Sequence, residues 1–520
     1  MAVLGTLQTF KGGHYFGQFE GTPRGRIQSM PLPQRVIIFL KQGFGEAVAP
    51  LVKEGDKVLA GQIIGRDDEK ISTPIHASIS GVVRKIEDRP HPLGGFSKAI
   101  IIESDGKDQW QLLERASINF ERMSPDEVGL ILYQAGVTDG GKCGFPTSFK
   151  SSPANPARIK FLLINAVETE PYLEADNQLL YEEFEKFVTG IRILRSALGN
   201  VAVHIGIGYN RPRLIEELEV RFEYHDWLHI HPLRPKYPQG DDEILIRTLL
   251  GLSVPSGGYA VDIGAVVCEV QHTIAAYEAV IEGKPFIERV ISIGGSAVAE
   301  PVNLKVRVGT PIGEIFKKIK VSEPARIILG GVMRGLAQND HTKLAELEKQ
   351  LTELEARLKA APEEEKMTLA PQLNKLRTQR RELSERIKWA TEAPITRNTP
   401  AVIALSEAQK ELMPIAGLGF DKDSFTKAFV PLPWVTKRAS TSLNGLPRPC
   451  VKCGYCTDVC PSNLVPIMIA EFSMQDMLLE AQELDIFACI ECGLCTYVCP
   501  SKIPVMTQIL EGKRKIREET

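Results

Sequence analysis

The chain has 520 residues, of which 43% are hydrophobic and 24% charged, and a formal net charge of −3. This balance is typical of a globular protein with several domains, and it gives no reason to expect nucleic acid or an anionic membrane as the main partner. No apolar run is long enough to span a bilayer, and the N-terminal residues lack the charged-then-apolar layout of a signal peptide. We therefore expect a cytoplasmic protein, or one held at the cytoplasmic face of a membrane through other subunits.

Residues 1–110 predict a small β domain. Between residues 35 and 104, short apolar runs alternate with turn signals such as Gly55-Asp56, a pattern typical of hairpins. The pattern resembles the barrel-sandwich hybrid of lipoyl and biotinyl domains, and we expect an unmodified structural barrel here.

Residues 111–285 predict an α/β domain. The apolar runs 161–165 and 201–206 suit buried parallel strands, and 178–198 has helical periodicity. Alternation of strands and helices indicates a parallel sheet covered by helices.

Two motifs in this domain point to a ligand. A glycine-rich segment, 140–150, would let backbone N–H groups and a lysine approach a phosphate, although such a segment is often only a turn. Asn165 and Glu170 follow a predicted strand, where ligands of open α/β sheets bind. Asn165 can hydrogen-bond the edge of a flavin ring, and Glu170 can orient the amide or ribose of a nicotinamide.

Residues 286–340 and 391–410 predict a β-grasp module of the SLBB type, interrupted by an insert over 341–390. Leucines in the insert are spaced three and four apart on two arms around Pro362, which predicts an antiparallel coiled-coil hairpin. The hairpin could be a docking arm for a partner protein or a solvated decoration, because a heptad stripe buries itself without a partner.

After a linker over 411–445, residues 446–520 contain eight of the ten cysteines. Both cysteine runs follow the C-x2-C-x2-C-x3-C-P spacing of bacterial two-cluster ferredoxins. The first run consists of Cys450, Cys453, Cys456 and Cys460, and the second of Cys489, Cys492, Cys495 and Cys499. In a long chain without an export signal this indicates metal binding rather than disulfides. The alternative is a pair of zinc knuckles, which seldom repeat four cysteines at this spacing with a trailing proline.

The spacing predicts two [4Fe–4S] clusters with crossed ligands, because the fourth cysteine of each run reaches the other cluster. One cluster would be held by Cys450, Cys453, Cys456 and Cys499, and the other by Cys489, Cys492, Cys495 and Cys460. The intervening segment 464–484 reads as helical, so we expect a helical ferredoxin module.

The whole chain resembles the RnfC proteins of the Rnf electron-transport complex, the ion-pumping ferredoxin:NAD oxidoreductase. The segments that carry the resemblance are 11–14, 74–78, 144–147, 168–172, 236–240, 254–258, 330–333 and the two cysteine runs. The central part also resembles the flavin subunit of respiratory complex I. The overall expectation is an α/β multidomain protein that joins a barrel-sandwich hybrid, a flavin domain, a β-grasp module and a two-cluster ferredoxin.

The resemblance implies an FMN in the central domain, NADH over it, and electron transfer to the two clusters and on to other redox subunits. Several residues would surround the flavin: Gly141, Gly144, Lys150, Asn165, Glu168, Glu170, Tyr237 and Asp242. Phe145 would stack near the nicotinamide, and Phe145 and Glu170 would be the catalytic residues of the site.

The sequence departs from the family pattern at three places in this pocket. Lys142 stands in the glycine-rich loop, Asp242 replaces a glutamate, and Glu269 would repel a phosphate unless Lys142 or Lys150 pairs with it. These departures leave an alternative: an iron–sulfur relay or adaptor without enzyme activity, whose flavin pocket is degenerate and whose hairpin docks it in a larger complex. Reduction of a cobalamin or folate-linked partner would fit the same chain.

Overall fold

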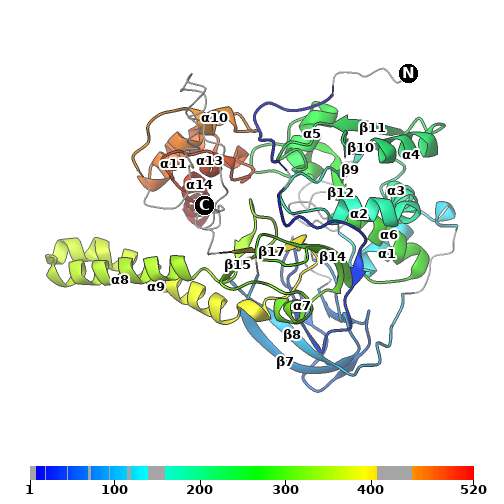
Figure 1. Cartoon of the computed structure of the whole chain (residues 1–520), viewed down its shortest axis with the longest axis horizontal. Coiled ribbons are helices and arrows are strands. Elements are labelled where there is room, and N and C mark those ends of the chain that lie inside the picture. Colours follow the sequence, from blue (N-terminus) through cyan, green and yellow to red (C-terminus); the bar gives the residue numbers. More distant parts are fainter. Residues whose placement is uncertain are drawn as a thin grey trace.

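The computed structural model describes residues 7–17, 19–43, 45–67, 72–92, 94–113, 119–138, 159–406 and 448–519. It consists of a β barrel, an α/β domain, a six-stranded sheet that carries a long helical hairpin, and a C-terminal helical domain (Figure 1). Within these residues, no helix combines the length and apolar character needed to cross a membrane.

The N-terminal β domain is a sandwich of two antiparallel sheets. One sheet has the order β2 (Arg35–Phe39), β8 (Phe96–Ser104), β7 (Gly81–Pro90) and β4 (Lys57–Val58); the other has the order β3 (Ala49–Pro50), β5 (Ile63–Arg66) and β6 (Ile75–His76). Val36 and Ile38 of β2 point into the core between the sheets, whereas Ile37 and Phe39 are buried on the opposite face. Both faces of β2 are buried, which explains why its sequence is a continuous apolar run.

The central domain is a four-stranded parallel sheet with helices on both faces. Its strand order is β11 (Leu228–Leu233), β10 (Ala202–Gly208), β9 (Phe161–Ala166) and β12 (Ala265–Glu269). The helices are α1 (Pro125–Gln134), α2 (Ala175–Glu182), α3 (Phe184–Ala197), α4 (Pro212–Phe222), α5 (Asp242–Leu250) and α6 (Val270–Tyr277). Leu162 and Ile164 of β9 face one apolar core and Leu163 faces the other. Asn165 is in register with Glu269, so the carboxyl ends of β9 and β12 meet at one edge.

The third part is a mixed sheet assembled from distant segments. Its order is β1 (Gln28–Ser29), β14 (Val302–Arg307), β13 (Glu288–Gly294), β17 (Ala401–Ser406), β15 (Ala325–Leu329) and β16 (Leu336–Ala337), with α7 (Ile312–Lys318) packed on it. Two long helices, α8 (His341–Ala360) and α9 (Glu363–Lys388), project from this sheet as a hairpin (Figure 1). Leu351, Leu354, Leu369 and Leu373 are buried between the two helices.

The C-terminal domain is built from short helices. They are α10 (Tyr455–Asp458), α11 (Pro466–Met474), α12 (Leu478–Glu483), α13 (Leu494–Tyr497) and α14 (Val505–Glu519). The segment 464–484 is helical as predicted, but it forms two helices, because α11 ends at Met474 and α12 begins at Leu478. Asp476, between them, has a left-handed backbone with φ of 58°, which an α-helix cannot contain.

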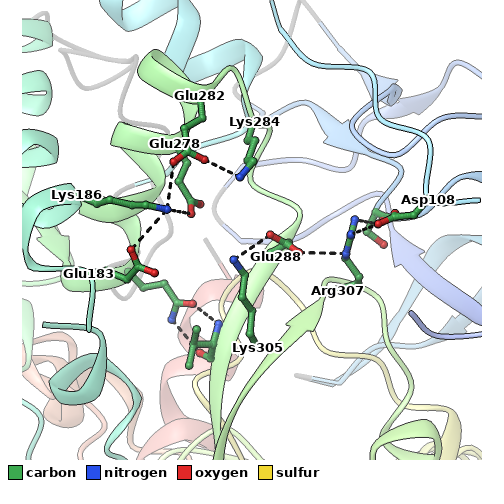
Figure 2. Close-up of polar contacts among 12 residues, drawn as sticks. Asp108, Glu183, Lys186, Glu278, Glu282, Lys284, Glu288, Lys305 and Arg307 are labelled. Carbon is green, nitrogen blue, oxygen red and sulfur yellow. Dashed lines mark hydrogen bonds and ion pairs between the residues drawn. The ribbon is translucent and has the colours of Figure 1, made fainter. Parts of the chain in front are cut away.

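Polar side chains link the six-stranded sheet to the barrel and to the α/β domain (Figure 2). Arg307 on β14 lies 2.7 Å from Asp108, which follows the barrel, and 3.3 Å from Glu288 on the neighbouring strand β13. Gln271 on α6 donates through its Nε2 to the Val290 carbonyl of β13 at 3.0 Å. The ion pair between Lys186 and Glu282 lies within the α/β domain, with 3.2 Å between Nζ and the carboxylate oxygen.

An N-terminal strap, residues 8–16, connects the α/β domain to the C-terminal domain. Gly13 N–H donates to the Val459 carbonyl at 2.9 Å, and His14 pairs with Tyr237 as an isolated β-bridge. Lys236 Nζ donates to the Gly12 carbonyl at 2.7 Å. The strap therefore contacts the first cysteine run and the loop before α5 at the same time.

Candidate functional site

Four of the predicted ligand-binding residues line one cavity of about 170 Å³. Asn165 reaches it from the end of β9, Glu168 and Glu170 from the segment that follows, and Tyr237 from the loop before α5. The cavity lies at the carboxyl edge of the parallel sheet, where ligands of this fold class bind. These four predicted residues therefore come together at one cavity.

The other predicted residues of the pocket have different outcomes. Gly141, Gly144, Phe145 and Lys150, together with Lys142, lie outside the described residues. Asp242 is the first residue of α5, and the preceding Asp241, rather than Asp242, lines the cavity. Asp241 also caps α5, since its Oδ1 accepts from the Glu243 N–H at 3.1 Å.

Asn165 connects the end of β9 to the loop before α5. Its Nδ2 donates to the Gly240 carbonyl at 2.7 Å, and its Oδ1 accepts from the Val167 N–H at 3.2 Å. A side-chain amide has two N–H donors, so one donor remains for a ligand.

Glu170 connects the cavity to the six-stranded sheet. Its Oε1 accepts from the Met333 N–H at 2.8 Å and from the Arg334 N–H at 3.3 Å. A Cβ at Gly331 would lie 1.8 Å from this oxygen, so only glycine fits there. Burial raises the pKa of Glu170, and the charge of Arg334 opposes that shift.

A group of carboxyls forms the opposite wall. Burial raises the pKa of Asp176 to about 7, and the neighbouring Glu269 contributes to the same shift. Burial and the charge of Asp176 raise the pKa of Glu168 well above its ordinary value. Arg289 of β13 places a positive charge beside Glu269, with its Nη2 4.0 Å from Glu269 Oε2. The predicted partners Lys142 and Lys150 lie outside the described residues.

These residues fit part of an FMN. Protonated and ionised carboxyls bind hydroxyl and ring N–H groups, and the Nε of the buried Arg289 has no hydrogen-bond partner among the described residues. The cavity is nevertheless smaller than the roughly 300–1,000 Å³ of typical ligand pockets. The described walls therefore suit the ring and polyol of a flavin, while an excess of carboxyls does not suit its phosphate.

A second cavity of about 580 Å³ lies on the other side of residues 168–170. Phe16, Phe19 and Tyr172 contribute aromatic rings to it, with the Phe19 and Tyr172 centroids 5.2 Å apart. Arg211 also lines it and lies 2.5 Å from Glu174. Aromatic faces with an arginine suit a nucleotide.

The cysteines of the C-terminal domain gather as the spacing predicted for one of the two sets. Every pair among Cys460, Cys489, Cys492 and Cys495 interacts electrostatically, although 28 residues separate the first two. In the other set, Cys456 interacts with Cys453.

The loops around these thiols fit [4Fe–4S] clusters. Gly454 and Gly493 have φ near 80° and begin α10 and α13, so the two loops have the same turn. The Leu464 N–H donates to Cys460 Sγ at 3.4 Å, the kind of contact that stabilises a thiolate ligand. No three His, Cys, Asp or Glu side chains in the described ranges converge closely enough for a single ion. Cluster ligands stand farther apart, since each binds a different iron.

The cavity and the second cysteine loop share one apolar core. Tyr237, from the cavity wall, donates its hydroxyl to the Cys492 carbonyl at 2.8 Å. Tyr237, Met333, Ile490 and Tyr497 pack in the same cluster, so three domains contribute to it. The hydroxyl of Tyr237 thus joins the cavity directly to the loop of a predicted cluster ligand.

Sequence reasoning missed Arg334, Asp241, Arg289 and Arg211. Arg334 directly follows the 330–333 segment that carried the family resemblance, and that position could have drawn attention to it. Arg289 and Arg211 come from elements far from residue 170 in the sequence, so no local pattern identifies them.

Comparison with known proteins extends over most of the chain. Residues 8–107 match the RnfC barrel sandwich hybrid domain, 132–278 the Nuo51 FMN-binding domain, and 449–503 the 4Fe-4S dicluster domain. The chain therefore carries a barrel-sandwich hybrid, a flavin-type α/β domain and a dicluster ferredoxin domain in this order. An NAD+-reducing [NiFe]-hydrogenase covers 78% of this chain and 63% of its own at 15% identity, with a TM-score of 0.43, which is too low to establish a shared fold.

The relatives are C subunits of ion-translocating complexes. That of the proton-translocating ferredoxin:NAD(+) oxidoreductase complex of Clostridium ljungdahlii is 38% identical over 341 residues, 64% of this chain and 74% of that protein. Its Na(+)-translocating counterpart in Acetobacterium woodii is 29% identical over 472 residues, 90% of this chain and 88% of that protein. The equivalent protein of an ion-translocating oxidoreductase complex of Haemophilus influenzae is 36% identical, but only 52% of it is covered. The chain belongs to the RnfC family of ion-translocating ferredoxin:NAD(+) oxidoreductase complexes.

Proposed function

We propose that this chain is an electron-transfer subunit that passes electrons between NADH and a partner redox protein through FMN and two [4Fe–4S] clusters. The observation that carries the proposal is the Tyr237 hydroxyl on the Cys492 carbonyl, because it places the cavity wall against a cluster loop. When bound, FMN would exchange a hydride with NADH and single electrons with the clusters.

The chain's own residues would hold and orient these groups. Asn165, Glu168 and Glu170 would hydrogen-bond the flavin ring and polyol, with Tyr237 and Asp242 nearby. Gly141, Gly144 and Lys150 would hold the phosphate, which the carboxyl-rich wall cannot do. The second cavity, with Phe16, Phe19 and Tyr172, suits NADH, and Phe145 would stack near its nicotinamide.

The two clusters have different positions relative to the cavity. We name the site of Cys460, Cys489, Cys492 and Cys495 the inner cluster, and that of Cys450, Cys453, Cys456 and Cys499 the outer cluster. Cys492 adjoins the cavity wall, whereas Cys453 is exposed. Electrons would therefore pass from the flavin to the inner cluster, then to the outer cluster, and from there to the partner, or in the reverse order.

The family supports a location and a class of partner. The relatives are named as subunits of complexes that translocate ions, so the partners would be other redox subunits. The chain would then be a peripheral protein on the cytoplasmic face of the membrane that holds those subunits.

The six-stranded sheet would be a β-grasp module of the SLBB type, and the hairpin a coiled-coil docking arm. Away from the point where it leaves the sheet, the hairpin contacts the C-terminal domain through an ion pair between Lys375 of α9 and Glu511 of α14. Replacing 341–388 with a short glycine-serine linker should leave the iron content unchanged but prevent co-purification with partner subunits. If that variant still co-purified with the partner subunits, the hairpin would not be their docking arm.

The cofactor content of the anaerobically purified chain tests the proposal. We expect about eight irons for two clusters, and about one FMN, per chain. Asn165→Ala should lower the retained FMN without lowering iron, because the Asn165 side chain bonds Gly240 and Val167 rather than a cysteine loop. Full iron without any flavin in the unaltered chain would instead support the adaptor alternative.

A further inference from the structure

Arg334 lies between the cavity and the loop of the inner cluster. Its Nη2 donates to Asp241 Oδ2 at 2.6 Å and is 3.5 Å from the Ile490 carbonyl. Its guanidinium carbon lies 5.8 Å from the centre of the Tyr237 ring. One side chain thus touches a cavity wall, the aromatic ring that joins cavity and cluster, and the cysteine loop.

Arg334 lies beside the loop that carries Cys492. Its Nη2 is 3.5 Å from the carbonyl of Ile490, two residues before this cysteine. Its carboxylate partner, Asp241, is on the cavity wall and has only 1% of its side chain exposed. Both partners line the cavity, and Arg334 also reaches the carbonyl of Ile490 in the loop of the inner cluster.

We propose that Arg334 sets the reduction potential of the inner cluster by stabilising its reduced form. This inference rests on the proposed function, because it requires the crossed ligand set around Cys492. Reduction adds one electron to a cluster, and no bond forms or breaks. A fixed cation beside one ligand favours the state with more negative charge, so Arg334 raises the potential.

The same geometry gives Arg334 a second consequence. Its backbone N–H binds Glu170, and its side chain binds Asp241, so both walls of the cavity are connected to the residue beside the inner cluster. Arg334 is a positioning residue, since it acts on the cluster through space and through its carboxylate partner.

An EPR-monitored redox titration of the full chain, purified anaerobically with its clusters, tests the proposal. In Arg334→Gln, the inner potential should become more negative, while the outer potential stays unchanged and serves as an internal reference. Arg334→Lys keeps the positive charge, so its inner potential should lie close to the wild-type value. A Cys453→Ser variant, which alters only the outer site, assigns the two signals.

Two further variants separate an electrostatic role from a structural one. Asp241→Asn removes the opposing charge but retains the helix cap, so the inner potential should shift in the opposite direction, to more positive values. Arg211→Gln is a matched control, because Arg211 is also partly buried and paired with one carboxylate on a cavity wall. It should leave both potentials unchanged.

The proposal would be overturned if the inner potential were the same in Arg334→Gln and wild type. Equal shifts of the inner and outer potentials in Arg334→Gln would also overturn it. So would shifts of the inner potential that have the same sign in Arg334→Gln and Asp241→Asn. Failure of the proposed function looks different. In that case the iron content of the unaltered chain would be too low for two clusters. Arg334 would then have no inner cluster to act on.

Discussion

At the scale of single residues, the cavity wall combines groups that oppose folding. Glu168, Asp176 and Glu269 are carboxyls close to one another, and Arg289 is the cation that partly balances them. Such an arrangement lowers stability, and protein sites often retain that cost where a ligand must bind. The same groups, when protonated, donate hydrogen bonds that ordinary carboxylates cannot.

Asp176 gives this cost a pH dependence. Its pKa is raised from 3.8 to about 7, so between these values the folded chain keeps a proton that the unfolded chain has released. Stability therefore falls as pH rises through this window, and the loss is complete above it. Asp176→Asn should raise the free energy of unfolding at pH 8 by about 1–3 kcal/mol, and with it the midpoint of thermal unfolding. At pH 4 the midpoint should stay unchanged.

Unfolding of the cofactor-free chain at the two pH values measures this effect. Glu219→Gln, at an exposed position of α4, is the control and should change neither midpoint. An equal gain from Asp176→Asn at pH 4 and pH 8 would show that ionisation of this carboxyl is not the cause.

At the scale of elements, the strap holds the first cysteine run in place through its backbone. Gly12 has a φ of 75°, and a Cβ there would lie 2.7 Å from the Cys460 carbonyl oxygen. The position therefore requires glycine both for its left-handed backbone and for its close contact.

Replacing Gly12 with alanine should disturb the inner cluster selectively. Strain and steric overlap should cost about 1–3 kcal/mol, and the displaced Cys460 should lower inner-cluster occupancy while the outer signal persists. Iron content and EPR measure this. Gly17→Ala is the control, since a Cβ there meets nothing within 4 Å; equal iron loss in both variants would contradict the role of the strap.

Local patterns predicted most elements but not their junctions. Apolar runs placed strands at 161–165 and 201–206, and the structure has β9 and β10 there, because buried parallel strands are apolar on both faces. Leucine spacing placed two helices over 341–390, where α8 and α9 lie. The segment 464–484 is helical as predicted, but its break was not predicted, because the left-handed backbone of Asp476 leaves no signal in the apolar periodicity.

At the scale of the molecule, three domains share one apolar core beside the cavity. Residues Tyr237, Met333 and Cys492 come from the α/β domain, the six-stranded sheet and the C-terminal domain. The sequence motifs predicted the barrel-sandwich hybrid, the flavin-type α/β domain and the dicluster domain that the family models match. The dicluster domain was recognisable because the chemistry of an iron–sulfur site requires a fixed local spacing. The motifs could not identify Arg334 as the link, since its partners Asp241 and Ile490 are distant in the sequence.

The direct test of the account is electron exchange between nicotinamide and the clusters in the isolated chain. The chain is first loaded with FMN and clusters under anaerobic conditions. Its oxidised form is then mixed with NADH, and its reduced form with NAD+. The absorption of the flavin and the EPR signals of the clusters are followed in both mixtures. We predict that at least one direction changes both flavin and cluster signals, with two electrons per nicotinamide. A flavin-containing, cluster-loaded chain whose signals change in neither direction would contradict the account.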